Sequence, residues 1–206
     1  MEQRIITQVD QMVGEALHNQ FTDLTSHAYR VKDLTFQFIK TATVNHLQAF
    51  TLSPREARMV SNAASLHDIG KLLTPPGILE HSHDLTEEEE EKLRLHTVDG
   101  AMLLYFSTAY QHTMVRKYAF EIALHHHERI DGNGYPDGLK DADLAPWLQM
   151  ASLADALAAL TEDRGNRPAQ PPEEAWAMIL RGQFGTFDDR LLRCLDSNQS
   201  GWMPAG

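Results

Sequence analysis

The segment His67-Asp68-Ile69-Gly70-Lys71 places an imidazole beside a carboxylate, with a lysine three residues further along the chain. Further histidines and an aspartate recur on the sides of the helices that we expect to face inward. The whole set is His27, His67, Asp68, His96, His126, His127 and Asp155. One histidine on an apolar face is more often a hydrogen-bonded core residue than a ligand. Burying seven such groups without compensation would cost several kcal/mol each, so a polyvalent cation is the simplest explanation.

The chemistry of these side chains limits the kind of metal. Imidazole and carboxylate ligands without thiolate favour Fe, Mn, Zn, Co or Ni over Ca or Mg, and we expect iron or manganese. Seven ligands exceed what one ion takes, so we expect two ions about 3.5 to 4 Å apart, bridged by Asp68. Such a pair generates a hydroxide nucleophile at neutral pH and neutralises transition-state charge. The predicted reaction is therefore hydrolysis of a phosphate ester.

The ligand residues lie in segments with helical periodicity. Residues 23–42 predict a helix, because His27, Val31, Leu34 and Phe38 recur at offsets of 4, 7 and 11. Further helices are expected over residues 115–128, 147–162 and 173–181, with an irregular loop at 131–138. A short helix over residues 1–20 would precede the main domain at 21–206. No segment alternates as a β-strand does, so we predict an all-α helical bundle with a metal centre in its core.

Two capping boxes mark helix starts at Ser53 and Thr86. The first helix is expected to carry the His67-Asp68 pair in its last turn and to end at Gly70 in a left-handed cap. The second is expected to run past residue 103 and to direct His96 inward. Its acidic run at 87–91 is interpreted as a solvated helix start, where the helix dipole favours negative charge.

Composition excludes several other classes. Lys and Arg total 18 against 29 Asp and Glu, and the resulting net charge of −11 argues against DNA or RNA as partners. Cys194 is the single cysteine, so no internal disulfide can form, which fits a reducing cytoplasm. No apolar run approaches the roughly 18 residues that span a bilayer. We therefore expect a soluble cytoplasmic protein without a membrane partner.

In this order, HDIGK at 67–71, HHE at 126–128 and DGNGYP at 131–136 form a highly specific set. Together with His27, His96 and Asp155 they resemble the HD-GYP family, a branch of the HD-domain phosphohydrolases. The resemblance runs from about residue 23 to 192. It implies an HD fold and a bacterial phosphodiesterase that opens cyclic di-GMP to the linear dinucleotide or GMP. Some family members act on hybrid cyclic dinucleotides.

The resemblance also implies roles for individual residues. The seven residues named above match the family's metal ligands, with Asp68 as the bridge. Lys71 matches the lysine that contacts the scissile phosphate or the attacking hydroxide, so Asp68 and Lys71 form the expected catalytic pair. Tyr135, Arg164 and Arg167 match substrate-binding residues. Asp23 lies one turn before His27 and is either a ligand for a third metal ion or a helix cap.

Two departures from the family pattern lie near the expected substrate site. The chain reads DALAALT at 155–161, without the family's second aspartate, and RGNR at 164–167 in place of RPYR. Neither departure affects the metal ligands, whereas both bear on which dinucleotide is bound. Two other functions stay open: a non-catalytic sensor or interaction module for the nucleotide, and a phosphohydrolase acting on another nucleotide. Regulation by a separate partner protein and the oligomeric state are also left open.

Overall fold

The computed structural model of the chain describes residues 24–79, 85–108, 114–163 and 168–203. Its α-helices are α2 (Leu24–Val44), α3 (Pro54–Ala64), α4 (Pro76–Leu79), α5 (Glu87–Arg94), α6 (His96–Phe106), α7 (Met114–His125), α8 (Pro146–Leu160), α9 (Pro172–Leu180) and α10 (Asp189–Asp196). Short 3₁₀ helices are η1 (Gln48–Phe50), η2 (Ile69–Leu73), η3 (Asp141–Asp143) and η4 (Gln199–Gly201). No β-strand occurs within these ranges, which confirms the all-α prediction. The expected helix over 1–20 lies outside them.

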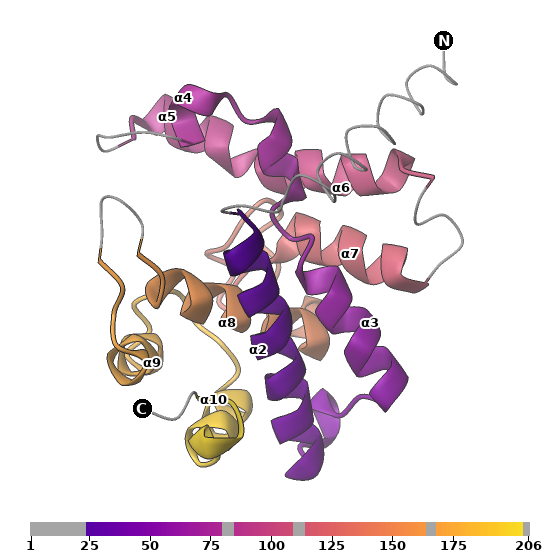
Figure 1. Cartoon of the computed structure of the whole chain (residues 1–206), viewed down its shortest axis with the longest axis vertical. Coiled ribbons are helices and arrows are strands. Elements are labelled where there is room, and N and C mark those ends of the chain that lie inside the picture. Colours follow the sequence, from indigo (N-terminus) through magenta and orange to yellow (C-terminus); the bar gives the residue numbers. More distant parts are fainter. Residues whose placement is uncertain (1–23, 80–84, 109–113, 164–167, 204–206) are drawn as a thin grey trace.

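Helix α2 runs through the middle of the molecule and packs against α3 and α8 (Figure 1). Val31, Phe38 and Ile39 on its inner side are at most 1% exposed. Helix α8 is enclosed more completely, because twelve of its fifteen residues are buried. A helix that is apolar on nearly all sides belongs in a protein core. The Asp155 carboxylate on α8 is therefore held where an unpaired charge would be costly.

The other helices extend this core in two directions. Helix α7 packs against α3 and α6, and α6 also packs against η2. The α4–α5 segment lies with α6 at one end of the molecule (Figure 1). Helix α9 packs against α8, and α10 packs against α2. None of the described helices is long and apolar enough to cross a bilayer. The arrangement directs residues from α2, η2, α6, α7 and α8 toward one another.

Both predicted capping boxes are present. The Ser53 side chain accepts from the Glu56 backbone N–H, and the Glu56 carboxylate accepts from the Ser53 N–H at 3.0 Å. Thr86 and Glu89 make the same reciprocal pair at the start of α5. No residue of α5 is buried, which confirms its acidic run as a solvated helix start.

The helix that begins at Thr86 is interrupted at Leu95, whereas the sequence pattern predicted one helix through residue 103. Leu95 closes α5 and precedes α6. The His96 imidazole and the Thr97 hydroxyl donate to the carbonyl oxygens of Leu93 and Arg94. These side-chain donors take the place of the backbone N–H groups that would continue the helix.

Candidate metal centre

The His67-Asp68 pair lies in the turn between α3 and η2. It was predicted in the last turn of α3, but that helix ends at Ala64. The His67 side chain is almost completely buried, and its Nδ1 atom bonds the Ala64 carbonyl oxygen at 2.9 Å. The end of α3 therefore fixes the direction of this imidazole.

Gly70 does not form the predicted left-handed cap. It lies within η2, and its φ angle is not positive. A Cβ atom at this position would lie 1.9 Å from the His96 carbonyl oxygen and 2.4 Å from the Gly100 backbone nitrogen. The absence of a side chain lets η2 lie directly on the first turn of α6. As a result, the Asp68 Oδ1 atom lies 3.3 Å from the His96 Nε2 atom.

His126 and His127 follow the end of α7 at His125 and lie in a turn. The glycine of the GYP motif folds the next loop back onto this pair, because a Cβ atom on Gly134 would lie 2.5 Å from the His127 carbonyl oxygen. The Tyr135 ring then stacks on the His127 imidazole, with centroids 4.7 Å apart and planes inclined by 23°.

The structure brings all seven predicted ligand residues together. Candidate ligand atoms within 4.8 Å of one another form three groups: His96, His126 and His127; His27, His67 and Asp68; His67, His126 and Asp155. His67 and His126 each belong to two groups, so the three form one continuous centre. Asp68 lies between His67 and His126, because its Oδ2 atom is 3.3 Å from His67 Nε2 and its Oδ1 atom is 3.8 Å from His126 Nε2. This is the position that a bridging carboxylate requires.

Three histidines are oriented by the backbone. The Nδ1 atoms of His67, His96 and His126 each bond a carbonyl oxygen of the preceding helical turn. Because a carbonyl only accepts, Nδ1 carries a proton, and Nε2 is the atom that would offer a lone pair to a metal ion. Metal-binding histidines are held in this way. The Nε2 atoms of His96 and His126 lie 3.3 Å apart, where two lone pairs would repel each other without a cation.

The polar atoms of the centre fit a divalent metal. His67 Nε2 and Asp68 Oδ1 are buried and have no hydrogen-bond partner among the described residues. A buried polar atom without a partner costs about 1–3 kcal/mol. Nitrogen and oxygen ligands without sulfur match the preferences of iron, manganese and zinc. A cation at this point would satisfy both orphaned atoms.

The charges around His67 support the same conclusion. Burial opposes protonation of this imidazole, but the negative charges of Asp68 and Asp155 raise its pKa to about 10. Although Asp155 is buried, the hydrogen bond from His27 and the positive charge of His67 hold its pKa well below the usual range. The buried carboxylates of Asp68 and Asp155 therefore need compensating positive charge inside the core. A metal ion would replace the His67 proton, as metal binding at histidine generally does.

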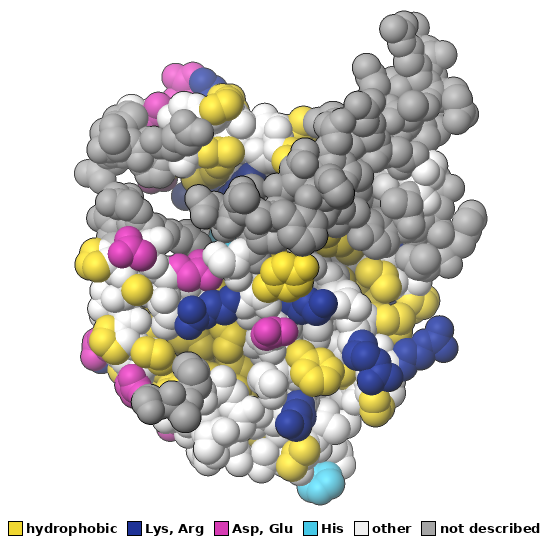
Figure 2. Space-filling model, in the orientation of Figure 1, with side chains coloured by type: hydrophobic (Ala, Val, Ile, Leu, Met, Phe, Trp, Pro, Cys, Tyr) yellow, Lys and Arg dark blue, Asp and Glu magenta, His cyan; other side chains and the backbone are white. Residues whose placement is uncertain are grey.

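Lys71 lies at the edge of this centre, three residues after Asp68. Its Nζ atom is 2.6 Å from Asp68 Oδ2, and its side chain is 21% exposed. Although burial opposes ionisation of Asp68, the neighbouring Lys71 and His67 hold the pKa of this carboxyl well below its usual range. Basic side chains are visible beneath the α4–α5 segment (Figure 2). Lys71 thus combines contact with the centre and contact with solvent.

The loop that carries Tyr135 is held by Glu128. The Glu128 side chain is 2% exposed, and its carboxylate accepts from the backbone N–H groups of Asp137, Gly138 and Leu139 at 2.7, 3.0 and 3.0 Å. The HHE motif therefore contributes two candidate ligands and one residue that fixes the adjacent loop. The sequence analysis gave Glu128 no role.

Glu162 is a second residue of the site that the sequence analysis did not identify. Its Oε2 atom lies 2.7 Å from His27 Nδ1, while His27 Nε2 lies 3.1 Å from Asp155 Oδ1. The two residues are 135 positions apart. Helical periodicity cannot reveal a contact between α2 and the end of α8, and only the packing of these helices makes it visible.

Three predicted site residues, Asp23, Arg164 and Arg167, lie outside the described residues. The histidines assigned no ligand role are also accounted for where the structure describes them. His46 is exposed, and His125 bonds Asp137 Oδ2 at 3.0 Å. His18, His81, His83 and His112 lie outside the described ranges.

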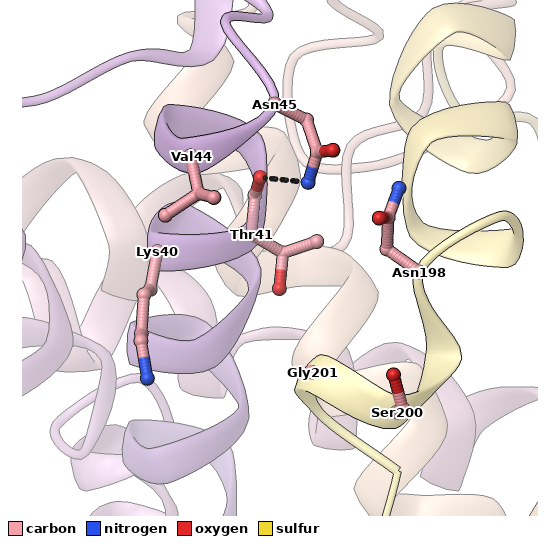
Figure 3. A pocket seen from close by; sticks show the side chains of 7 residues that line it. All are labelled: Lys40, Thr41, Val44, Asn45, Asn198, Ser200 and Gly201. Atoms are coloured by element: carbon pink, nitrogen blue, oxygen red, sulfur yellow. Dashed lines mark hydrogen bonds between the residues drawn. The ribbon is translucent and has the colours of Figure 1, made fainter.

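A small pocket lies far from this centre, between the end of α2 and η4 (Figure 3). Lys40 and Thr41 line one side, and Ser200 and Gly201 line the other. Fourteen residues of α2 separate Thr41 from His27, a distance of about 21 Å at 1.5 Å per residue. The lining contains one charged side chain and no carboxylate, so this pocket lacks the groups that the predicted chemistry needs.

Comparison with known proteins agrees with the geometry. Residues 14–191 match the family model described as HD domain. The cyclic di-GMP phosphodiesterase response regulator RpfG of Xanthomonas campestris is 37% identical over 151 residues, covering 71% of this chain and 37% of its own length. The 3′3′-cGAMP-specific phosphodiesterase 2 of Vibrio cholerae is 30% identical over 146 residues, covering 71% of this chain and 27% of its own length. The chain thus spans about a third of the length of these relatives.

A solved structure shares the fold. It is described as Bd1817, a HDG"Y"P protein from Bdellovibrio bacteriovorus, and it superposes with a TM-score of 0.61 at 21% identity. The match covers 86% of this chain and 53% of that one. The helical fold of this chain is therefore shared with a known structure.

Proposed function

The chain belongs to the HD domain family and to its HD-GYP branch, and on this premise we propose that it is a metal-dependent phosphodiesterase that hydrolyses a cyclic dinucleotide. The observation that carries the proposal is the group of buried, unpartnered ligand atoms, His67 Nε2 and Asp68 Oδ1, beside the Lys71 ammonium. The names of the relatives support cyclic di-GMP as the first substrate to test, with 3′3′-cGAMP as the second.

An HD domain binds divalent metal, and the seven clustered side chains supply more ligands than one ion takes. We infer two ions, iron or manganese, with Asp68 between them. A third ion would need Asp23, which matches the family position for that role. When bound, the ions supply Lewis acidity and an activated water at neutral pH.

The chain's own residues have separable tasks in this proposal. Asp68 holds the two halves of the ligand cluster together. Lys71 places a positive charge beside Asp68, where it would stabilise the charge that develops on the phosphate. Tyr135, stacked on His127, forms a wall for the substrate. Arg164 and Arg167 would bind phosphate oxygens, a task that an acidic protein must give to local cations.

Asp68→Ala is the substitution that tests the proposal. Without its bridging carboxylate the chain should lose most bound metal and all turnover of cyclic di-GMP, while its helix content stays intact. Elemental analysis after anaerobic and aerobic purification measures the metal, and far-UV circular dichroism measures the helix. Asp33→Ala is the matched control, because Asp33 is exposed on α2. Metal-dependent turnover retained by Asp68→Ala would refute the assignment.

The same samples separate this function from its competitors. Wild-type protein that binds metal and cyclic di-GMP without hydrolysing it would be a sensor module, and turnover of another nucleotide alone would change the substrate class. The end product, the linear dinucleotide or GMP, is read from the same reactions. Location in the bacterial cytoplasm is part of the proposal and rests on the single cysteine.

A further inference from the structure

His27 differs from the three backbone-oriented histidines in what holds its Nδ1 atom. His67, His96 and His126 bond carbonyl oxygens within four residues of their own position. His27 instead bonds the Glu162 carboxylate at 2.7 Å. Among these four imidazoles, it is the one whose orientation depends on a side chain from a distant part of the chain.

The position of Glu162 suits this task. It lies two residues after the end of α8, where the Thr161 backbone N–H and hydroxyl bond the Leu157 carbonyl oxygen at 3.2 and 2.8 Å and hold the chain. The Glu162 side chain is 18% exposed. Its other oxygen, Oε1, is buried and has no hydrogen-bond partner among the described residues. The carboxylate is therefore committed to His27 within the part of the chain that the structure describes.

The contact fixes the tautomer that a ligand at His27 needs. A carboxylate accepts but does not donate when ionised, so Nδ1 must carry the proton that lies between the two residues. His27 Nε2 donates to Asp155 Oδ1 at 3.1 Å, within the ligand cluster, and a metal ion would replace this proton. An imidazole protonated at Nδ1 can offer its Nε2 lone pair to a cation at that point. Carboxylate, histidine and metal in this order form a common arrangement in metal sites.

We propose that Glu162 is the positioning residue of His27, accepting its Nδ1 proton so that Nε2 is directed to the metal. The inference rests on the proposed function and deepens it, because it assigns a role in metal binding to a residue outside the ligand set. Glu162 itself contacts neither substrate nor metal in this role. Its effect on hydrolysis would pass through the occupancy of the ion that His27 binds.

Glu162→Leu is the sharpest test, because it keeps a side chain of similar size and removes the acceptor. Without an acceptor at Nδ1, the neutral imidazole is expected to keep its proton at Nε2, where Asp155 accepts it, and the lone pair is removed from the centre. We expect metal affinity at the His27 position to fall by about 10- to 100-fold, with the ion on the His96, His126 and His127 side retained. Titration with Mn²⁺ in competition with a chelator of known affinity measures the metal affinity of both positions.

Two further variants test whether the loss of metal affinity is specific to the Glu162 carboxylate. Asp163→Asn changes the same charge one residue away on an exposed side chain, and it should leave affinity unchanged. Glu162→Asp keeps a carboxylate that is one methylene shorter, so its affinity should fall between those of wild type and Glu162→Leu. Equal affinities for wild type and Glu162→Leu would overturn the proposal.

The tautomer of His27 can also be measured in the metal-free protein, without an activity assay. In ¹⁵N NMR correlation spectra of the metal-free protein, His27 Nδ1 should show the chemical shift of a protonated nitrogen. In Glu162→Leu it should move to the unprotonated range, with Nε2 protonated against Asp155. Unchanged shifts would overturn the role of Glu162. Failure of wild type to bind metal would refute the proposed function instead, so the two failures are distinguishable.

Discussion

The Glu128 carboxylate gives a quantitative prediction about the loop at the centre. Its three hydrogen bonds come from consecutive backbone N–H groups, two to Oε1 and one to Oε2. Hydrogen bonds to a charged group contribute roughly 1.5–3 kcal/mol each. In Glu128→Gln the two bonds to one oxygen can persist, while the new NH₂ group faces the Leu139 N–H. We therefore expect about 2 kcal/mol less protection of the Leu139 amide.

Hydrogen exchange measures this loss directly. A change of about 2 kcal/mol corresponds to roughly 30-fold faster exchange of the Leu139 amide, since 1.4 kcal/mol is a factor of ten. The metal content should stay unchanged, because Glu128 lies outside the ligand cluster. KM for the nucleotide should rise, because Tyr135 belongs to the same loop. Glu91→Gln, on the exposed side of α5, is the matched control.

The exchange rate of the Leu139 amide decides whether the Glu128 carboxylate holds the loop. If Leu139 exchanged at the wild-type rate in Glu128→Gln, the carboxylate would not be what holds the loop. Faster exchange throughout α7 and α8 would instead indicate global destabilisation. Urea unfolding of the same variant separates these cases, because it reports the free energy of unfolding of the whole chain.

Two other substitutions test the packing that positions the site. Gly70→Ala should destabilise the protein strongly, by about 3 kcal/mol or more, because its Cβ atom would meet the His96 carbonyl oxygen; a free energy of unfolding within 0.5 kcal/mol of wild type would contradict this. Asp188→Ala should cost about 1–2 kcal/mol at pH 6, because Asp188 caps α10 by accepting from the Arg190 and Leu191 N–H groups. The Arg190 side chain lowers the pKa of Asp188, so the stabilisation is complete above the unfolded pKa of about 3.9 and is lost as pH falls through the lower folded value. The difference between wild type and Asp188→Ala should therefore shrink below pH 4 in urea titrations, and a constant difference would contradict the assignment.

Structural features that depend on a few neighbouring residues could be predicted from the sequence. The capping boxes at Ser53 and Thr86, the inward face of α2 and the all-helical class follow from spacing and turn chemistry, and the structure has each of them. The clustering of the seven candidate ligand residues could also be predicted, because inward-facing imidazoles and carboxylates need a common partner. These inferences required no knowledge of which helices touch.

Contacts between distant segments could not be predicted from the sequence. Gly70 looked like a helix cap, yet its role is to admit α6, a property of the neighbouring element. The interruption at Leu95 depends on the side chains of His96 and Thr97 capping carbonyl oxygens, which periodicity does not encode. No local pattern distinguishes Glu162 from a solvated carboxylate that follows a helix. Only the packing of α2 on α8 places it at His27.

The anchoring of three imidazoles on main-chain carbonyls has a consequence for protein engineering. A library that randomises side chains around the centre changes its polarity and volume, but it leaves the Nδ1 contacts of His67, His96 and His126 intact, because their partners are main-chain carbonyl oxygens. The Nδ1 contact of His27 depends on the Glu162 side chain instead. We therefore expect selection for altered metal preference to return to position 162, while the other three histidines keep their orientation.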